Sequence, residues 1–167
     1  MSQISEPLNS ARKKSDFSCG KEMLDNYIHR QASQDVKRKL SVCFVAKDKL
    51  TNLIKGYYTL SNNSISQEFI PAEIRKKLPD SYESIPTTLL GRLAIDHRFQ
   101  GEGVGKLLLI DALKRSYDIS KTIGSFAVIV DPMDQDAENF YAKYGFIKLP
   151  DSGKMFLPMN TIKQLFE

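Results

Sequence analysis

The stretch from Arg92 to Leu113 reads RLAIDHRFQGEGVGKLLLIDAL and places three glycines within five positions, directly before a leucine-rich run. The preceding run TTLLGRLAI (87–95) is typical of a strand, and GKLLLIDALKRSYDIS (105–120) is typical of a helix. Glycines between a strand and a helix let successive backbone N–H groups point into one concave site at the positive end of the helix dipole. The stretch therefore predicts a binding site for a pyrophosphate.

The spacing of the glycines separates this loop from two well-known phosphate-binding loops. A P-loop requires G-x-x-x-x-G-K-[ST], but Gln100 stands where its first glycine belongs and Leu107 follows Lys106. The dinucleotide fingerprint G-x-G-x-x-G needs a third glycine at Lys106 and a place in the first βαβ unit. The pattern that fits is Q-x-x-G-x-G, formed by Gln100, Gly103 and Gly105.

The composition is that of a globular protein and excludes a disordered or membrane-spanning chain. The sequence has 167 residues, of which 41% are hydrophobic and 26% charged, so we expect one domain over residues 1–167. No apolar run approaches the roughly 18 residues of a membrane span, and no apolar leader segment follows the N-terminus, which predicts a cytoplasmic protein. Cys19 and Cys43 have no metal or redox spacing, so we expect small buried hydrophobes and no metal site.

Helical and strand patterns alternate along the chain. Helices are predicted over 20–34, 71–78 with Pro71 in its first turn, 105–120, and 134–145, which opens with acidic residues and closes on Gly145. Strands are predicted over 41–46 and 54–66 as a hairpin, over 87–95 and 125–131, and once or twice within 146–150 and 154–159. The order predicts a mixed α/β (α+β) fold.

The net charge is +4, and the basic residues gather in short clusters. Three clusters stand out: Arg12, Lys13 and Lys14; Lys37, Arg38 and Lys39; and Arg75, Lys76 and Lys77. A basic surface attracts phosphate-rich ligands, either a nucleotide cofactor or a nucleic acid. Charge alone also fits ordinary solvated surface, so both interpretations stay open.

The loop and the strand before it resemble those of the GNAT acetyltransferase superfamily. In that family, a Q/R-x-x-G-x-G/A loop holds the pyrophosphate of acetyl-coenzyme A, and the preceding strand pairs with the pantetheine arm. The resemblance implies a central mixed, mostly antiparallel sheet flanked by helices, with acetyl-CoA as co-substrate. It implies these cofactor-binding residues: Leu93, Ala94 and Ile95 in the strand, and Gln100, Gly101, Glu102, Gly103, Val104, Gly105 and Lys106 in the loop.

A second motif, AENFYAKYGF (137–146), matches the A-x-x-F-Y-x-x-x-G-F signature of the same family. The match places Tyr141 at the position of the tyrosine that protonates the departing coenzyme A thiolate. A phenol with a pKa near 10 can donate to a thiolate whose conjugate acid has a pKa near 8.5. Phe140 and Tyr144 are expected to be the packing face of an amphipathic helix, and packing alone stays open for Tyr141.

The N-terminal half resembles the GNAT toxins of toxin–antitoxin modules, which carry an F-x-C/S-G…LD-x-Y-L…A-x-QD pattern. The matching residues are Phe17, Cys19, Gly20, Leu24, Asp25, Tyr27, Ile28, Ala32, Gln34 and Asp35, with isoleucine where leucine is usual. The block LLGRLAIDHRFQGEGVG (89–105), which includes Arg92, follows the same subfamily. The resemblance implies a toxin that acetylates the α-amino group of aminoacyl-tRNA and blocks translation, a ribbon-helix-helix antitoxin as its partner, and a homodimer.

No single residue stands out as a general base. At pH 7 an α-amino group costs only about 1 kcal/mol to deprotonate, against about 4 kcal/mol for a lysine, so an aminoacyl-tRNA substrate needs a base less. His97 and Glu102 flank the loop and could act as a base through water, although a lone histidine on a turn is more often a surface or hydrogen-bonding residue. Asp96 is expected to end the strand. Arg92 either faces the substrate, as the basic clusters at 37–39 and 75–77 would, or pairs with a nearby acid.

Two other functions stay open. A stand-alone GNAT enzyme acting on a small amine or a protein terminus would have an acidic or narrow pocket instead of a basic rim. A non-catalytic GNAT-fold module would bind only a partner, or DNA together with a partner. The intact loop and Tyr141 argue against this second alternative.

Overall fold

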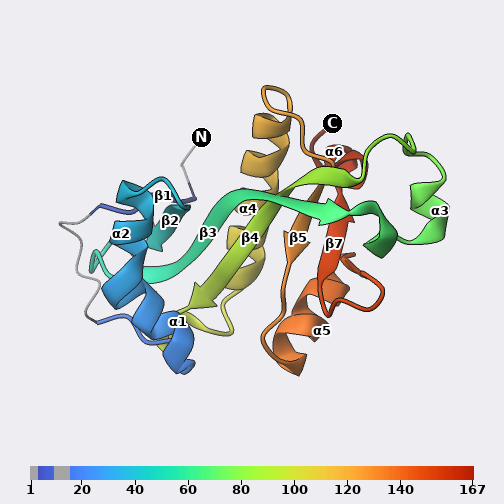
Figure 1. Cartoon of the computed structure of the whole chain (residues 1–167). Helices are drawn as coiled ribbons and strands as arrows, with labels where there is room; N and C mark the ends of the chain where they lie inside the picture. Colours follow the sequence, from blue (N-terminus) through green and yellow to red (C-terminus); the bar gives the residue numbers. More distant parts are fainter. Residues whose placement is uncertain (1–3, 10–15) are drawn as a thin grey trace. The chain divides into compact units, whose positions relative to one another are not determined.

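The structure is a computed structural model that describes residues 4–9 and 16–167 (Figure 1). The basic cluster Arg12, Lys13 and Lys14 lies outside these described residues. By its internal contacts the chain divides into two compact units, each built from two segments. Unit 1 contains Met1–Ser61 and Leu90–Leu113, and unit 2 contains Asn62–Leu89 and Lys114–Glu167.

The strands and helices between residues 20 and 158 follow the predicted order, and β1 and α6 are elements that the sequence did not predict. The strands are β1 (Glu6–Pro7), β2 (Val42–Lys47), β3 (Ile54–Ser66), β4 (Ser84–Ile95), β5 (Ala127–Val130), β6 (Ile147–Lys148) and β7 (Met155–Pro158). The helices are α1 (Glu22–Asn26), η1 (Tyr27–Gln31), α2 (Ala32–Lys37), η2 (Gln67–Phe69), α3 (Ala72–Arg75), η3 (His97–Phe99), α4 (Val104–Ser120), α5 (Gln135–Lys143) and α6 (Met159–Phe166).

The strands are hydrogen-bonded in the order β1-β2-β3-β4-β5-β7-β6. β4 and β5 run parallel, with Thr88 opposite Val128, and α4 lies between them in the chain, as a parallel connection requires. The pairs β1 with β2, β2 with β3, β5 with β7 and β6 with β7 are antiparallel. The mixed, mostly antiparallel sheet with helices confirms the predicted fold class.

The helix predicted over 20–34 is a helical segment over 22–37 with a π-helical turn, η1, at its centre. A π turn inserts an extra residue and so changes which side chains face the core. Tyr27 and Ile28 are buried, whereas Met23, which lies four residues before Tyr27 and would share its face in a regular α-helix, is 71% exposed. A constant period of 3.6 residues cannot anticipate this change of face.

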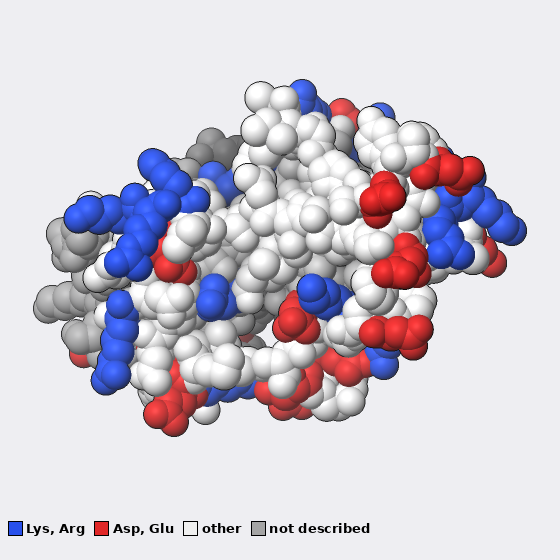
Figure 2. Space-filling model, in the orientation of Figure 1, with Lys and Arg blue, Asp and Glu red and all other residues white. Residues whose placement is uncertain are grey.

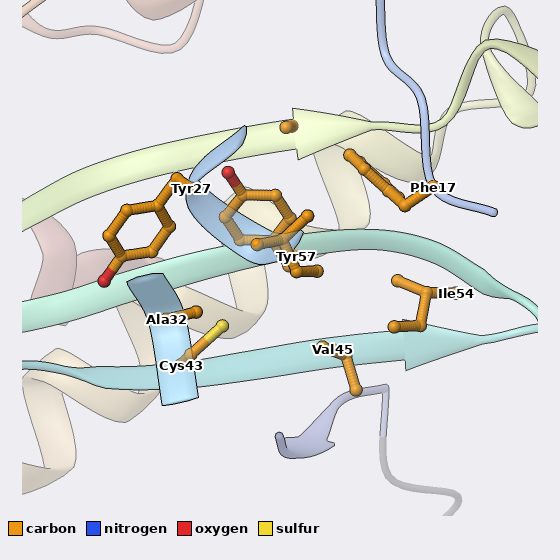
Figure 3. Packing of buried hydrophobic residues seen from close by; sticks show 9 residues of the cluster. Phe17, Tyr27, Ala32, Cys43, Val45, Ile54 and Tyr57 are labelled. Carbon is orange, nitrogen blue, oxygen red and sulfur yellow. The ribbon is translucent and has the colours of Figure 1, made fainter. Parts of the chain in front are cut away.

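Unit 1 has a core rich in aromatic side chains (Figure 3). Its buried members are Phe17, Tyr27, Ile28, Ala32, Cys43, Val45, Ile54, Tyr57 and Ala94. The ring of Tyr57 meets Phe17 edge-on at a centroid distance of 5.4 Å and stacks on Tyr27 at 6.3 Å. Cys43 is buried as predicted, whereas Cys19 packs against this core but stays partly exposed.

Helix α4 lies very close to β3 at Gly56. A Cβ at this position would be 2.7 Å from Leu108 Cδ1 and 2.8 Å from the carbonyl oxygen of Ala94, distances at which atoms overlap. Lack of space therefore requires glycine here, and the missing side chain lets α4 pack directly on the strand.

Unit 2 has its own core around β5, whose four residues are all buried. The core contains Ile65, Ile70, Ile85, Ala127, Ile129, Leu149 and Phe156. Helix α5 begins after Asp134, whose carboxylate accepts a hydrogen bond from the Ala137 N–H at 2.9 Å, and it is followed by Gly145 with φ +95°. The acidic start and the glycine end that the sequence predicted are confirmed.

Two predicted boundaries are wrong, and one helix was not predicted. β4 begins at Ser84 instead of residue 87, and Pro71 is the N-cap of the four-residue α3 instead of a first-turn residue. Helix α6, which buries Met159 and Ile162, has no counterpart among the predicted helices. Because α6 follows β7 directly and has no side chain capping its first turn, its sequence lacks the usual signal for a helix start.

Candidate functional site

The glycine loop joins β4 to α4 within unit 1. Gly101 and Gly103 have φ values of +82° and +80°, in the left-handed region that favours glycine. A Cβ on either residue would meet no other heavy atom within 4 Å, so backbone conformation, and not crowding, requires these glycines. Gly105 lies in the first turn of α4 and has no positive φ. The loop is therefore an open turn at the N-terminus of a seventeen-residue helix, where backbone N–H groups favour an anion.

Asp96 anchors the start of this loop. Its side chain is fully buried and accepts hydrogen bonds from the Ser18 N–H at 3.1 Å, from the Arg98 N–H at 2.9 Å, and from the Arg98 guanidinium at 2.9 Å. Burial raises the pKa of Asp96, but the bonds from Arg98 and Ser18 outweigh burial and hold this pKa at about 2. Asp96 does end the strand, and its charge also ties the loop to the segment around Ser18.

The segment 16–20 is held along the loop by further bonds. The carbonyl oxygen of Ser18 accepts from the N–H of His97 at 2.9 Å and from its ring Nδ1 at 2.8 Å. The Gln100 amide donates to the carbonyls of Cys19 at 3.1 Å and Ile95 at 2.9 Å. His97 is therefore an exposed hydrogen-bonding residue, and Gln100 stabilises the loop from the protein side.

Sequence reasoning missed this contact between segment 16–20 and the loop. The two parts of this contact are visible in the sequence as the D-x-R pattern of Asp96 and Arg98 and the segment D-F-S-C-G. Their proximity in space is not, because no sequence pattern links the two segments. Asp25 completes the arrangement, because its carboxylate accepts from the Cys19 N–H at 2.8 Å. Burial raises the pKa of the Cys19 thiol to about 11, which makes it a poor nucleophile.

The end of β4 runs beyond its parallel neighbour. Leu89 lies opposite Ile129, and β5 ends one residue later, at Val130, whereas β4 continues to Ile95. In this register, residues 91–95 have no β5 residue opposite them. The backbone of Leu93, Ala94 and Ile95 is thus placed where an extended ligand can bind along the strand.

Arg92 lies over the ring of Tyr27, with its guanidinium carbon 3.5 Å from the ring centroid. The Tyr27 hydroxyl donates to the buried Asp35 carboxylate at 2.9 Å and lies 3.1 Å from Ser41 Oγ. Over the described residues 4–9 and 16–167, no ion pair joins Arg92 to a carboxylate, so of its two alternatives the pairing with a nearby acid finds no support there.

Tyr141 lies in unit 2, on α5, and its ring is buried against Phe140 and Phe146 at centroid distances of 5.3 Å. Burial raises the pKa of Tyr141 above its ordinary value, so its phenol is protonated at neutral pH and available as a donor. Phe140 and Tyr144 pack together at 5.1 Å, as expected for the apolar face of this helix.

A family model described as "Acetyltransferase (GNAT) domain" matches residues 22–160. The chain belongs to the GNAT acetyltransferase family. It is 33% identical to the "tRNA-acetylating toxin" of Mycobacterium tuberculosis (strain ATCC 25618 / H37Rv), over 99% of this chain and 98% of that relative. It is 32% identical to the "Probable toxin TacT" of Sinorhizobium fredii (strain NBRC 101917 / NGR234), over 98% of this chain and 94% of the relative.

Several solved structures resemble this chain over almost its whole length. AtaT complexed with acetyl-methionyl-tRNAfMet has a TM-score of 0.89 at 28% identity, with 98% of both chains covered. AtaTR bound with AcCoA has a TM-score of 0.86 at 27% identity, covering 98% of this chain and 97% of that one. A mutant AtaT bound to the C-terminus of the antitoxin AtaR has a TM-score of 0.81 at 26% identity, covering 97% and 96%.

The two described basic clusters of this GNAT chain have different surroundings. Lys37, Arg38 and Lys39 are exposed at the end of α2, and the nearest acid in sequence, Asp35, is buried. The exposed cluster Arg75, Lys76 and Lys77 lies among four exposed acids, Glu68, Glu73, Asp80 and Glu83. Figure 2 shows Lys and Arg gathered near α2, and both signs of charge over α3. The α2 cluster is therefore the stronger candidate for a nucleic-acid contact.

The remaining predicted residues of the GNAT loop follow its open geometry. Glu102 and Lys106 are exposed, whereas Val104 is buried where α4 begins.

In the described part of the chain, no group of three or more His, Cys, Asp or Glu side chains could hold a metal ion. Over the same residues, no helix is both long and apolar enough to cross a membrane.

Proposed function

We propose that this GNAT chain is a toxin that transfers an acetyl group from acetyl-CoA to the α-amino group of aminoacyl-tRNA and thereby blocks translation. The observation that carries the proposal is the end-to-end similarity to a protein named "tRNA-acetylating toxin", at 33% identity over 99% of the chain. The exposed basic cluster on α2 supports a nucleic-acid substrate over a small amine, because a small cation would be repelled there.

The cofactor binds along β4 and the loop in this proposal. The backbone N–H groups of residues 100–106 hold the pyrophosphate at the start of α4. The pantetheine arm lies along Leu93, Ala94 and Ile95, where β4 continues past β5. Asp96 and Gln100 keep the loop in this conformation through their bonds to residues 18 and 19.

Tyr141 acts as the general acid in this proposal. The neutral amine attacks the thioester carbon, the new C–N bond forms, and the C–S bond breaks to release a thiolate. The Tyr141 hydroxyl donates its proton to this sulfur, and water takes the proton lost by the attacking nitrogen. Because an α-amino group has a pKa near 7.7–8.0, roughly a tenth of it or more is neutral at pH 7, so the reactive form is present without a dedicated base.

The partners and location follow from the same proposal. AtaT has been seen bound to the C-terminus of its antitoxin AtaR, and we expect a ribbon-helix-helix antitoxin to restrain this chain in the same way. We also expect residues 1–167 to work as one catalytic domain, to form a homodimer, and to act in the cytoplasm, where aminoacyl-tRNA is found.

Acetylation by the purified chain tests the proposal. Radiolabelled acetyl-CoA is supplied with bulk aminoacyl-tRNA, with deacylated tRNA, with spermine, or with a peptide carrying a free N-terminus. We expect label in aminoacyl-tRNA alone. Label in spermine or the peptide, with none in aminoacyl-tRNA, would replace the toxin by a stand-alone acetyltransferase, and failure to bind acetyl-CoA would point to a non-catalytic module.

The variant Tyr141→Phe tests the general acid in the same assay. The ring and its packing are kept, so we expect unchanged stability and acetyl-CoA affinity, with transfer slowed by about 10²–10⁴-fold. Tyr144→Phe on the same helix is the matched control and is expected to transfer at the wild-type rate. Equal rates for Tyr141→Phe and the wild type would assign Tyr141 to packing alone.

A further inference from the structure

Arg92 carries a positive charge that no carboxylate neutralises within the described chain. Its side chain is half-buried, and its guanidinium carbon lies 3.5 Å from the ring centroid of Tyr27. A guanidinium has five N–H donors in one plane. Stacking on a ring occupies one face of that plane and leaves the donors at its edge available to a ligand.

The ring that supports Arg92 is itself held in place. Tyr27 is 3% exposed, its hydroxyl donates to Asp35 at 2.9 Å and lies 3.1 Å from Ser41 Oγ, and its ring stacks on Tyr57. Figure 3 shows Tyr27 and Tyr57 side by side in the core of unit 1. The guanidinium therefore rests on a rigid surface, and it loses little conformational freedom when it binds a ligand.

The position of Arg92 on β4 separates it from the pyrophosphate loop. Arg92 and Ala94 lie two residues apart on the same face of the strand, and Ala94 belongs to the same buried core as Tyr27. About 10 Å of extended strand separates Arg92 from Ile95, at about 3.3 Å per residue. Arg92 is thus at the far end of the proposed pantetheine strand, where the arm would carry its thioester.

We propose that Arg92, supported by Tyr27, binds a backbone phosphate at the 3′ end of the tRNA substrate and so positions the aminoacyl group beside the thioester. This inference rests on the proposed function. A planar guanidinium matches two phosphate oxygens at once. A guanidinium plane can also stack on an unpaired base, as in recognition of single-stranded RNA ends. The phosphates of coenzyme A offer the same chemistry, and the two sources are separated by experiment.

Kinetics of Arg92→Gln and Arg92→Lys test this role. For Arg92→Gln we expect KM for aminoacyl-tRNA to rise about tenfold or more, with kcat changed much less and acetyl-CoA affinity unchanged. The slope of log KM against log salt should fall by about 0.7–0.9, the contribution of one lost phosphate contact. Arg92→Lys keeps the charge and should keep the slope, with a smaller rise in KM. Lys163→Gln removes an exposed charge on α6 and is the control.

Four other results would contradict the proposal, and each has a different meaning. A rise in the acetyl-CoA KM, with aminoacyl-tRNA unaffected, would assign the Arg92 contact to coenzyme A and overturn the proposal. Wild-type values of both KM and salt slope in Arg92→Gln would reduce Arg92 to a packing residue. If Arg92→Gln does not fold, Arg92→Lys decides, because an unchanged KM there removes the bidentate contact. A wild-type chain that acetylates no aminoacyl-tRNA would overturn the proposed function itself.

Discussion

The variant Asp96→Asn is expected to destabilise the fold and to loosen the cofactor loop. Asparagine has nearly the same shape as aspartate, but it has one acceptor oxygen and an NH2 group that faces N–H donors. Asp96 accepts from the backbone of Ser18 and from both the backbone and the guanidinium of Arg98. The variant therefore removes the charge that holds segment 16–20 against the start of the loop.

The pKa of Asp96 sets the size of this effect. The folded chain holds this pKa at about 2, against 3.8 for an ordinary aspartate. Ionised Asp96 therefore contributes about 2 kcal/mol to the free energy of unfolding at pH 7. Because the folded pKa is the lower one, the unfolded chain binds the proton first as pH falls. The contribution is complete above about pH 4, is reduced to about 1 kcal/mol at pH 3, and is lost as pH falls through 2.

Urea denaturation of wild type and Asp96→Asn at pH 7 and pH 3 measures this difference. We expect about 2 kcal/mol at pH 7 and about half of that at pH 3. The control is Asp118→Asn, which breaks an exposed pair with Lys114 at 3.0 Å and should cost less than about 0.5 kcal/mol. A difference in the free energy of unfolding that is independent of pH would refute the charge argument. A difference below about 0.5 kcal/mol at pH 7, the value expected for an exposed pair, would show that Asp96 does not anchor the loop.

Two further predictions concern the loop and the basic surface. Gly103→Val forces a β-branched residue to a φ of +80°, so we expect acetyl-CoA binding measured by calorimetry to weaken by at least about tenfold, whereas Gly124→Val, at a glycine without positive φ, should bind as the wild type does. Reversing the charges of Lys37, Arg38 and Lys39 should raise KM for aminoacyl-tRNA and flatten its salt dependence, with acetyl-CoA affinity unchanged. Reversing Arg75, Lys76 and Lys77 should have the smaller effect because exposed acids surround them, and a larger effect there would reverse our assignment.

The elements of the fold that depend on local pattern could be predicted from the sequence. The hairpin of β2 and β3, the helix α4, and the capped ends of α5 follow from periodicity, glycine placement and an acidic N-cap. The π turn could not be predicted, because it breaks the period that reveals a helix. Helix α6 was missed because its apolar residues follow a strand without a turn or a cap between them.

The candidate site shows the same division between local and distant contacts. The Q-x-x-G-x-G spacing singled out Gly103, whose left-handed φ is a property of the loop alone, whereas Gly105 of the same motif has no positive φ. The bond from Ser18 to Asp96 joins residues 78 positions apart, and no local pattern records such a contact. Arg92 was singled out from the sequence, but its support by Tyr27 depends on how β4 packs against η1.

Gly56 lies outside the glycine loop, and yet the position of the anion site depends on it. Any side chain at this position on β3 would overlap the Leu108 side chain of α4 and the backbone carbonyl of Ala94, so it would displace the end of β4 that leads into the loop. A bulkier residue would therefore displace the anion site while every residue of the Q-x-x-G-x-G motif stayed the same. Where a chain of this family keeps the motif but replaces this glycine, the packing of α4 and β4 against β3, and not the loop sequence, should decide whether an acetyltransferase activity is assigned.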